Sequence, residues 1–348
     1  TFKPTQRNGY YDLVIEVPGE VVRGKETVVF ENLYRDGRMV AVHNDIFDEG
    51  QTTKTVNPEI GTRLADVDTK KKVLNPISKI VLRDKVYYKD LVVGEEYKLR
   101  LNLWNRATND YVKDANGNRL VVEKTFIPKV KTGTVDVDVK IDLSKFKGID
   151  LVALEELSYK GEILATHKDK EDKNQTIKVM NPKIKTKFAT IDGKKYVSSR
   201  LPVTLVDTVS FTDLVPGERY EISAIVMNKE TKKPVVIDGK TVEVKIAFTT
   251  PNKANQENGG VSGTIEVPVK LNLGGYKGED IVMFETLRYK GEIITEHKDI
   301  NDKDQTIKVK NHYALPTTGG VEVAGSIIMG AMTMLSMAGV SIKRSRKN

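Results

Sequence analysis

The 348-residue chain contains no cysteine. Disulfide bonds and thiolate metal sites are therefore excluded, and any covalent cross-link must use other side chains. The chain also lacks a basic stripe interleaved with aromatic residues: its charged residues, 30% of the total, carry both signs and are spread along the sequence. Its net charge of +8 comes partly from a basic cluster at the extreme C-terminus. A nucleic-acid partner is therefore not expected.

No segment before Val321 has the periodicity of an amphipathic helix. Apolar and polar residues instead alternate in 134–141 and 218–227, which indicates strands with one face buried. Turn signals punctuate the chain at Asn116 with Gly117, Asp192 with Gly193, and Asp238 with Gly239. Short strands joined by such turns predict an all-β fold of antiparallel β-sandwiches in tandem.

An internal repeat defines the units. A glutamate followed at fixed spacing by His-x-Asp-x-x-Asp-x-x-Gln-Thr occurs three times, as Glu31, His43 and Gln51, as Glu155, His167 and Gln175, and as Glu285, His297 and Gln305. An upstream Asp-x-Val-x-aromatic block occurs at Asp84 and again at Asp207. We therefore expect complete repeats at 58–181 and 182–311, preceded at 1–57 by the C-terminal portion of a truncated repeat.

The repeated side chains have two interpretations. Taken singly, a threonine on a strand, a glutamine before threonine or an Asp-rich turn is ordinary sheet surface, and duplication alone copies such residues. The alternative is chemical, because histidine is suited to take the proton of a threonine hydroxyl and a protonated carboxyl can assist attack on a glutamine amide. Burial would raise the pKa of Glu155 and Glu285 enough to supply that proton. Attack would expel ammonia and leave a Thr-Gln ester.

These motifs resemble the ester-bond domains of Gram-positive adhesins, the VaFE repeats, over nearly all of residues 1–310. The resemblance implies Ig-like or Cna-B-like sandwiches in which one threonine near the start of each domain is joined to one glutamine near its end. It implies the ester pairs Thr62 with Gln175 and Thr186 with Gln305, the bases His167 and His297, the acids Glu155 and Glu285, and assistance from Asp84 and Asp207. Glu31, His43 and Gln51 would be a remnant without a threonine partner.

The relation of glutamate to histidine stays open at this point. Each pair flanks a hairpin turn, for instance at Lys160 with Gly161. With a two-residue loop alone, Glu31 would stand opposite Val42, so that His43 would point to the other face. A three-residue loop or a β-bulge would bring glutamate and histidine to one face.

The C-terminal segment, 312–348, contains three signals in a fixed order. A pentapeptide comes first, namely Leu315, Pro316, Thr317, Thr318 and Gly319, followed by the apolar stretch 321–342 and a basic tail. At about 1.5 Å per residue this stretch can cross the roughly 30 Å hydrocarbon core as a transmembrane helix, and the tail would stay in the cytoplasm. The order resembles an LPxTG cell-wall sorting signal, which implies that a sortase cuts after Thr318 and transfers the chain to a peptidoglycan precursor.

The expected function is a structural stalk of a cell-wall-anchored adhesin. Such a chain is secreted, so we expect an N-terminal segment before Thr1 that includes a tip for a host or surface ligand. Two alternatives are a sortase-polymerised pilus subunit, although no Tyr-Pro-Lys pilin motif is present, and a module that binds Ca²⁺ through the HxDxxD carboxylates. We expect neither a cofactor nor a resident metal, and no enzyme that turns over external substrates.

Overall fold

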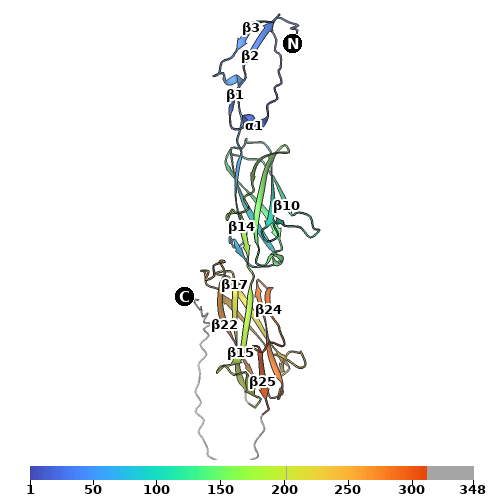
Figure 1. Cartoon of the computed structure of the whole chain (residues 1–348), viewed down its shortest axis with the longest axis vertical. Coiled ribbons are helices and arrows are strands. Elements are labelled where there is room, and N and C mark those ends of the chain that lie inside the picture. Colours follow the sequence, from blue (N-terminus) through green and yellow to red (C-terminus); the bar gives the residue numbers. More distant parts are fainter. Residues whose placement is uncertain (201, 312–348) are drawn as a thin grey trace, which may run out of the picture.

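The computed structural model describes residues 1–200 and 202–311. The molecule is elongated, with two β-sandwich domains stacked end to end along its long axis and a smaller N-terminal segment at one end (Figure 1). The predicted sorting motif and transmembrane helix lie outside the described residues. Within the described ranges, no helix is both long and apolar enough to cross a membrane.

The first complete domain has two facing sheets. Strands β11, β7 and β5 form a three-stranded sheet, and β10, β8, β12, β14 and β6 form a larger one in which β13 also pairs with β12 and β9 with β8. The bounds are β5 (Glu59–Asp66), β6 (Val73–Leu74), β7 (Ile80–Lys89), β8 (Tyr97–Asn105), β9 (Asp110–Tyr111), β10 (Val121–Phe126), β11 (Gly133–Ile141), η2 (Leu143–Phe146), β12 (Asp150–Tyr159), β13 (Glu162–His167) and β14 (Thr176–Val179).

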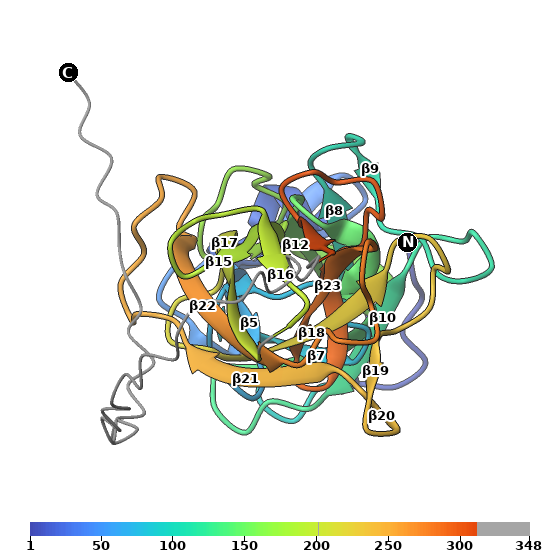
Figure 2. The ribbon, with the colours of Figure 1, turned by 90° about the horizontal axis from the view of Figure 1, so that it is seen from below.

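The second complete domain repeats this arrangement, with β15, β17 and β22 facing a sheet of β16, β25, β23, β18, β21 and β24 (Figure 2). The bounds are β15 (Lys183–Thr190), β16 (Tyr196–Ser198), β17 (Val203–Leu214), β18 (Arg219–Asn228), β19 (Val236–Ile237), β20 (Lys240–Thr241), β21 (Glu243–Thr249), β22 (Val261–Leu271), β23 (Asp280–Tyr289), β24 (Glu292–His297) and β25 (Thr306–Lys310). Strands β11 and β18 fall where the alternating pattern predicts them.

The alternation of buried and exposed residues explains the two-layer packing. Along β7 the side chains of Leu82, Asp84 and Val86 are buried, and along β17 those of Leu205, Asp207 and Val209. Since alternate residues of a strand face the same side, each aspartate points into the core between two apolar neighbours. A carboxyl in such a position costs free energy unless it is protonated or paired, so it needs an explanation beyond packing.

The N-terminal segment is built differently. It contains α1 (Gly19–Val22), β1 (Glu26–Val28), β2 (Glu31–Arg35), β3 (Arg38–His43), η1 (Glu49–Gln51) and β4 (Thr52–Lys54). Strands β2 and β3 form one hairpin and β1 pairs with β4. No residue of β2 or β3 is buried, because no second sheet of the described chain covers this hairpin.

The hairpin geometry left open by the sequence is a two-residue turn followed by a β-bulge. Both turn residues have positive φ, 48° at Lys160 and 92° at Gly161, as a type I′ turn requires. The register then shifts between Leu157 and Ser158, and this shift places Glu155 directly opposite His167. The other two hairpins have the same bulge, so glutamate and histidine share one face in all three copies.

The two complete domains meet at a polar joint. Lys71 Nζ of the first domain donates to Pro216 O at 2.7 Å and pairs with Glu218. Tyr220 OH donates to Asn75 Oδ1 at 3.0 Å across the same joint. Further contacts are Ser78 N to Glu292 Oε2 at 2.8 Å and Lys147 Nζ to Ile294 O at 2.6 Å. These contacts hold the first domain directly against the second.

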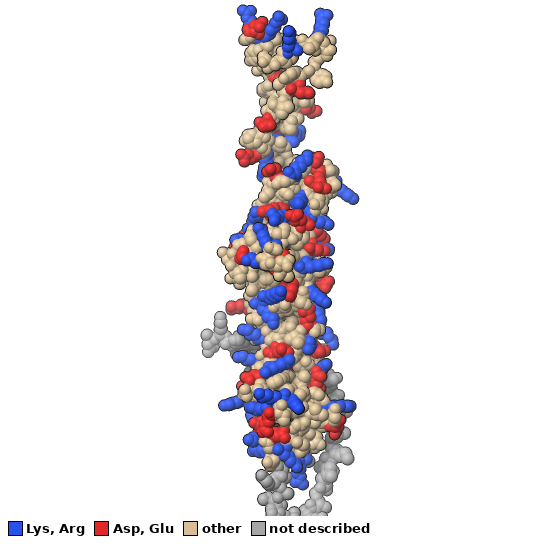
Figure 3. Space-filling model, turned by 90° about the vertical axis from the view of Figure 1, so that its right-hand side faces the viewer, with Lys and Arg blue, Asp and Glu red and all other residues tan. Residues whose placement is uncertain are grey.

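The surface agrees with the charge pattern of the sequence. On the face shown in Figure 3, basic and acidic side chains are interspersed along the whole length of both domains. No large area of one sign is visible there, and so that face offers no basic groove of the kind that holds a nucleic-acid backbone.

Candidate functional site

The three-stranded sheet contributes a threonine and an aspartate to each site. Thr62 on β5 pairs with Val86 on β7, and two positions along the register Leu64 pairs with Asp84. Thr62 and Asp84 are therefore diagonal neighbours on the inner face of this sheet. In the second domain Thr186 and Asp207 occupy the same relation on β15 and β17. Both threonines are 7% exposed and both aspartates are fully buried.

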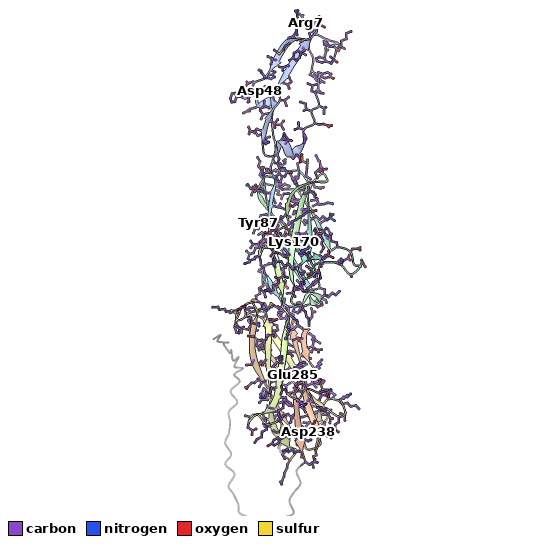
Figure 4. All side chains as sticks on the ribbon, in the orientation of Figure 1. Arg7, Asp48, Tyr87, Lys170, Asp238 and Glu285 are labelled. Atoms are coloured by element: carbon purple, nitrogen blue, oxygen red, sulfur yellow. The ribbon has the colours of Figure 1, made fainter. Side chains whose placement is uncertain are left out.

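The facing sheet contributes a glutamate and a histidine. Glu155 on β12 is opposite His167 on β13, and Glu285 on β23 is opposite His297 on β24. Glu285 comes from within the body of the second domain (Figure 4), where it is fully buried, and Glu155 is 1% exposed. The β-bulge thus gives each carboxyl an imidazole neighbour on the face that meets the threonine sheet.

The glutamine enters from the turn that precedes the last strand, β14 or β25. Both Gln175 and Gln305 are fully buried. The backbone of Gln175 is fixed on two sides, because its N–H donates to Asp172 O at 3.2 Å and its carbonyl accepts from Ala153 N at 3.0 Å. The turn therefore positions the amide between the two sheets, next to Thr62.

One aspartate in this turn of each domain, Asp172 or Asp302, belongs to the site but was not assigned a role from the sequence. Asp172 Oδ1 accepts from Asn174 N at 2.7 Å, and its Oδ2 lies 3.3 Å from His167 Nε2. Asp302 makes the same two contacts, including 3.1 Å from its Oδ2 to His297 Nε2. Each aspartate thus shapes the turn and orients the imidazole. The signal was present in the fixed His-to-Asp spacing of all three copies.

The reacting groups are in hydrogen-bond contact in both complete domains. Gln175 Nε2 is 2.6 Å from Thr62 Oγ1, and Gln305 Nε2 is 2.6 Å from Thr186 Oγ1. The Oε2 atom of the site glutamate, Glu155 or Glu285, accepts from both partners of its domain.

The second domain adds one contact that the first does not have at this distance. Thr186 Oγ1 lies 3.4 Å from His297 Nδ1, whereas His167 Nδ1 is buried without a hydrogen-bond partner. In both domains the glutamine Oε1 atom is also buried without a partner. The amide oxygen is therefore not stabilised in this uncross-linked arrangement.

The two carboxyl groups of each site have different pKa values. Burial, followed by the charge of the neighbouring aspartate, raises the pKa of Glu155 and Glu285 to about 10. Burial also raises the pKa of Asp84 and Asp207, but only to about 6. At neutral pH the glutamate is therefore protonated and can donate, while the aspartate is charged.

The N-terminal segment contains half of such a site. Gln51 Nε2 donates to Glu31 Oε2, and His43 Nε2 lies 2.9 Å from Asp48 Oδ2. Asp48 lies in the N-terminal segment, outside the two complete domains (Figure 4). Glu31 and His43 are exposed. Within residues 1–200 and 202–311, no threonine hydroxyl accepts from the Gln51 amide as that of Thr62 accepts from the Gln175 amide.

The HxDxxD carboxylates serve as turn caps. Asp169 Oδ1 accepts from Glu171 N at 2.9 Å, in the same way as Asp172 accepts from Asn174 N. Their oxygens thus bond to backbone N–H groups of their own turn, as aspartates in Asx-turns do. Over residues 1–200 and 202–311, no three histidine, aspartate or glutamate side chains are grouped as metal ligands.

Two solved proteins illustrate the similarity to known structures. A Mobiluncus mulieris adhesin that contains intramolecular disulfide, isopeptide and ester cross-links is similar in two crystal forms, at 15% and 16% identity and TM-scores of 0.30 and 0.31, over 66% of this chain and 80% of that one. A red sea bream transglutaminase is 10% identical, with a TM-score of 0.25, over 73% of this chain and 31% of the enzyme. A search of curated protein sequences finds no match.

The family model gives a clear result. The model of the T-Q ester bond containing domain matches the chain three times, at residues 1–55, 58–179 and 182–309. The three matches correspond to the three copies of the repeat and cover most of the sequence. This chain is a member of the family of T-Q ester bond containing domains.

Proposed function

We propose that each complete domain cross-links itself through an ester between threonine and glutamine, Thr62 with Gln175 and Thr186 with Gln305, and that the chain is a stalk of a surface adhesin. The observation that carries the proposal is the 2.6 Å contact between the threonine hydroxyl and the glutamine amide in both domains. Family membership supports the same pairing of residue types.

The first step is activation of the hydroxyl. His297, oriented by Asp302, takes the proton of Thr186 Oγ1 as the oxygen attacks Gln305 Cδ. The C=O double bond opens and its electron pair moves to Oε1. Protonated Glu285 donates a hydrogen bond to the developing oxyanion, and burial together with the charge of Asp207 keeps that proton on the glutamate by raising its pKa.

The second step expels the amide nitrogen. The tetrahedral intermediate collapses, the C–N bond breaks, and the proton held by the imidazole passes to the departing nitrogen. One threonine hydroxyl and one primary amide thus give one ester and one ammonia, with no oxidant or cofactor in the balance. His167, Glu155 and Asp84 have the same roles in the first domain. Each site acts once, so the domain is not an enzyme in the turnover sense.

The position of the cross-link suits a stalk. Thr186 lies on the first strand of its domain and Gln305 directly precedes the last one. An ester between them joins the chain's entry to its exit, so a pulling force bypasses most of the sandwich. Two such domains in line, held at a direct joint, would extend a binding region away from a surface.

Intact mass spectrometry tests the ester. Residues 1–318 should be lighter than the sequence mass by two ammonia molecules, one for each complete domain. Proteolysis should then yield peptides in which Thr62 is joined to Gln175 and Thr186 to Gln305. A folded protein with the unmodified mass would exclude the ester chemistry.

Anchoring to the cell wall is a separate part of the proposal, and it rests on the sorting motif 315–319 and the segment after it. A sortase would join Thr318 to a peptidoglycan precursor. Replacing the motif should leave the protein in the membrane or in the medium. Persistent covalent attachment to purified peptidoglycan would contradict the anchoring while leaving the ester proposal intact.

A further inference from the structure

A half-buried lysine adjoins each site and is not part of the ester chemistry described above. Lys72 precedes β6 and Lys195 precedes β16, the two short strands that run parallel to the last strand of their domains. Their backbone carbonyls accept from Lys178 N at 2.8 Å and Lys308 N at 2.9 Å. The two lysines are therefore equivalent positions of the repeat.

Their ammonium groups bind the peptide that carries the reacting glutamine. Lys72 Nζ donates to Asn174 O at 2.7 Å, and Lys195 Nζ donates to Asp304 O at 2.6 Å. These carbonyls belong to the peptide bonds that join Asn174 to Gln175 and Asp304 to Gln305. Each lysine thus contacts the carbonyl oxygen of the peptide bond whose nitrogen belongs to the reacting glutamine's backbone.

The same carbonyl also bonds to the threonine strand. Asn174 O accepts from Leu64 N at 3.0 Å, and Asp304 O accepts from Phe188 N at 2.9 Å. Both donors lie two residues after the reacting threonine. In the second domain Lys195 Nζ additionally donates to Phe188 O, so a single ammonium bridges β15 and the glutamine turn.

We propose that Lys72 and Lys195 are positioning residues for ester formation: the Lys195 ammonium ties the glutamine-bearing turn to the threonine-bearing strand, and the Lys72 ammonium fixes the equivalent turn through Lys173 O and Asn174 O, so that the amide rests against the hydroxyl. The proposal rests on the ester chemistry proposed above. It explains why a charged side chain is half-buried here although burial lowers its pKa. Lys195 has a second effect, because its charge lowers the pKa of Asp207 and so favours the ionised aspartate.

The rate of ester formation during synthesis tests this role. The chain is made by cell-free translation, samples are quenched in denaturant at intervals, and the cross-linked peptide of each domain is quantified. In Lys195→Met the Thr186–Gln305 ester should form roughly 10- to 100-fold more slowly, as expected when reacting groups lose their alignment. The Thr62–Gln175 ester of the same molecule should form at the wild-type rate and serves as the internal control.

Two further variants separate positioning from packing. Lys194→Met alters the neighbouring lysine, which pairs with Asp192 at the surface, and should leave both rates unchanged. Lys195→Arg keeps the charge and the donors, and should recover most of the lost rate. If the second domain of Lys195→Met does not melt cooperatively, Lys195→Gln, which keeps a donor but no charge, replaces it.

The outcomes are distinct. A wild-type rate in Lys195→Met, or a slow rate that Lys195→Arg does not relieve, would overturn the positioning role. Absence of both esters in the wild-type chain would instead overturn the proposed function itself.

Discussion

The N-terminal segment and the second complete domain contain the same glutamate, histidine and glutamine in the same register, but in different surroundings. Glu31 and Glu285 each pair with a histidine across a bulged hairpin, and each accepts from a glutamine amide. Glu31 is exposed, whereas Glu285 is fully buried beneath the sheet that carries Thr186 and Asp207. The motif alone is therefore not sufficient to form the site. The covering sheet supplies the nucleophile, the charged neighbour and the burial.

Substitution of the site glutamate should have the largest effect on the yield of the ester. Glu285→Gln keeps the size of the side chain but removes its acidic proton, so the Thr186–Gln305 ester should fall from full yield to none. The matched change Glu31→Gln should alter neither ester, because Glu31 has no threonine partner in the described chain. Peptide mapping by mass spectrometry measures both. A full ester yield in Glu285→Gln would remove the glutamate from the mechanism.

The amide of Gln51 extends the same contrast. It should remain a primary amide in the chain that has lost two ammonia molecules, because chemistry requires the threonine and not only the glutamate and histidine. A third ammonia loss that maps to Gln51 would show that the covering sheet is dispensable.

Replacing the site histidine should have a large effect on the stability of the second domain. Thr186 and Gln305 are 119 positions apart, and closing a loop of this size stabilises a domain by roughly 4 to 5 kcal/mol in the chain-entropy model. His297→Ala should prevent the ester while leaving the packing largely intact, since the ring is at the edge of the site. The second domain should then melt at a lower temperature and, when stretched, unfold to a long extension.

Single-molecule stretching provides the measurement, and His43→Ala is the matched control. The control should keep both esters and the short extension of the wild type. Equal extensions for wild type and His297→Ala would show that the cross-link does not carry the load.

The sequence allowed much of this arrangement to be predicted, because strand alternation and repeat spacing are local signals. The alternation predicted a strand in 218–227, and β18 spans Arg219–Asn228. The family resemblance is confirmed by the three matches of the family model.

Other features depend on contacts that spacing does not encode. The turn residues Lys160 and Gly161 are compatible with a hairpin with or without the β-bulge that shifts the register, so the sequence could not decide the face of His167. Asp172 resembles an ordinary turn cap until its second oxygen is seen beside the imidazole. Lys72 meets Asn174 across about a hundred residues of chain, and only the assembled sandwich brings them together.

A moderate effect should appear in the pH dependence of the uncross-linked domain. In His297→Ala both carboxyls remain, with pKa values raised by burial from 3.8 to about 6 at Asp207 and from 4.5 to about 10 at Glu285. Raised values mean that the folded state holds protons more tightly than the unfolded state. Through these two groups the domain should therefore be most stable near pH 4 and lose stability continuously as pH rises to 10, most steeply below about pH 6, where both carboxyls contribute.

Thermal melts of His297→Ala between pH 4 and 10 give this profile. Adding Asp207→Asn should make the loss between pH 4 and 6 shallower, because one of the two titrating groups is gone. If the melting temperature of the second domain rises from pH 4 to 8, the assignment of the two buried protons is wrong.

The smallest expected effect is on the stiffness of the joint between domains. This joint differs from the junction between the N-terminal segment and the first domain. The joint between the complete domains includes Lys71, which is paired with Glu218 and bonded to Pro216 O. The junction of the N-terminal segment with the first domain contains the more exposed contact of Arg23 Nη1 with Leu164 O at 3.2 Å.

A partly exposed ion pair is worth about 1 kcal/mol or less, so Lys71→Ala should leave the melting temperatures nearly unchanged. It should instead widen the distribution of distances between spin labels placed on the two complete domains. The matched change Arg23→Ala should not affect this distribution. Identical distributions for wild type and Lys71→Ala would show that the remaining contacts, such as Tyr220 OH with Asn75, are sufficient to keep the joint stiff.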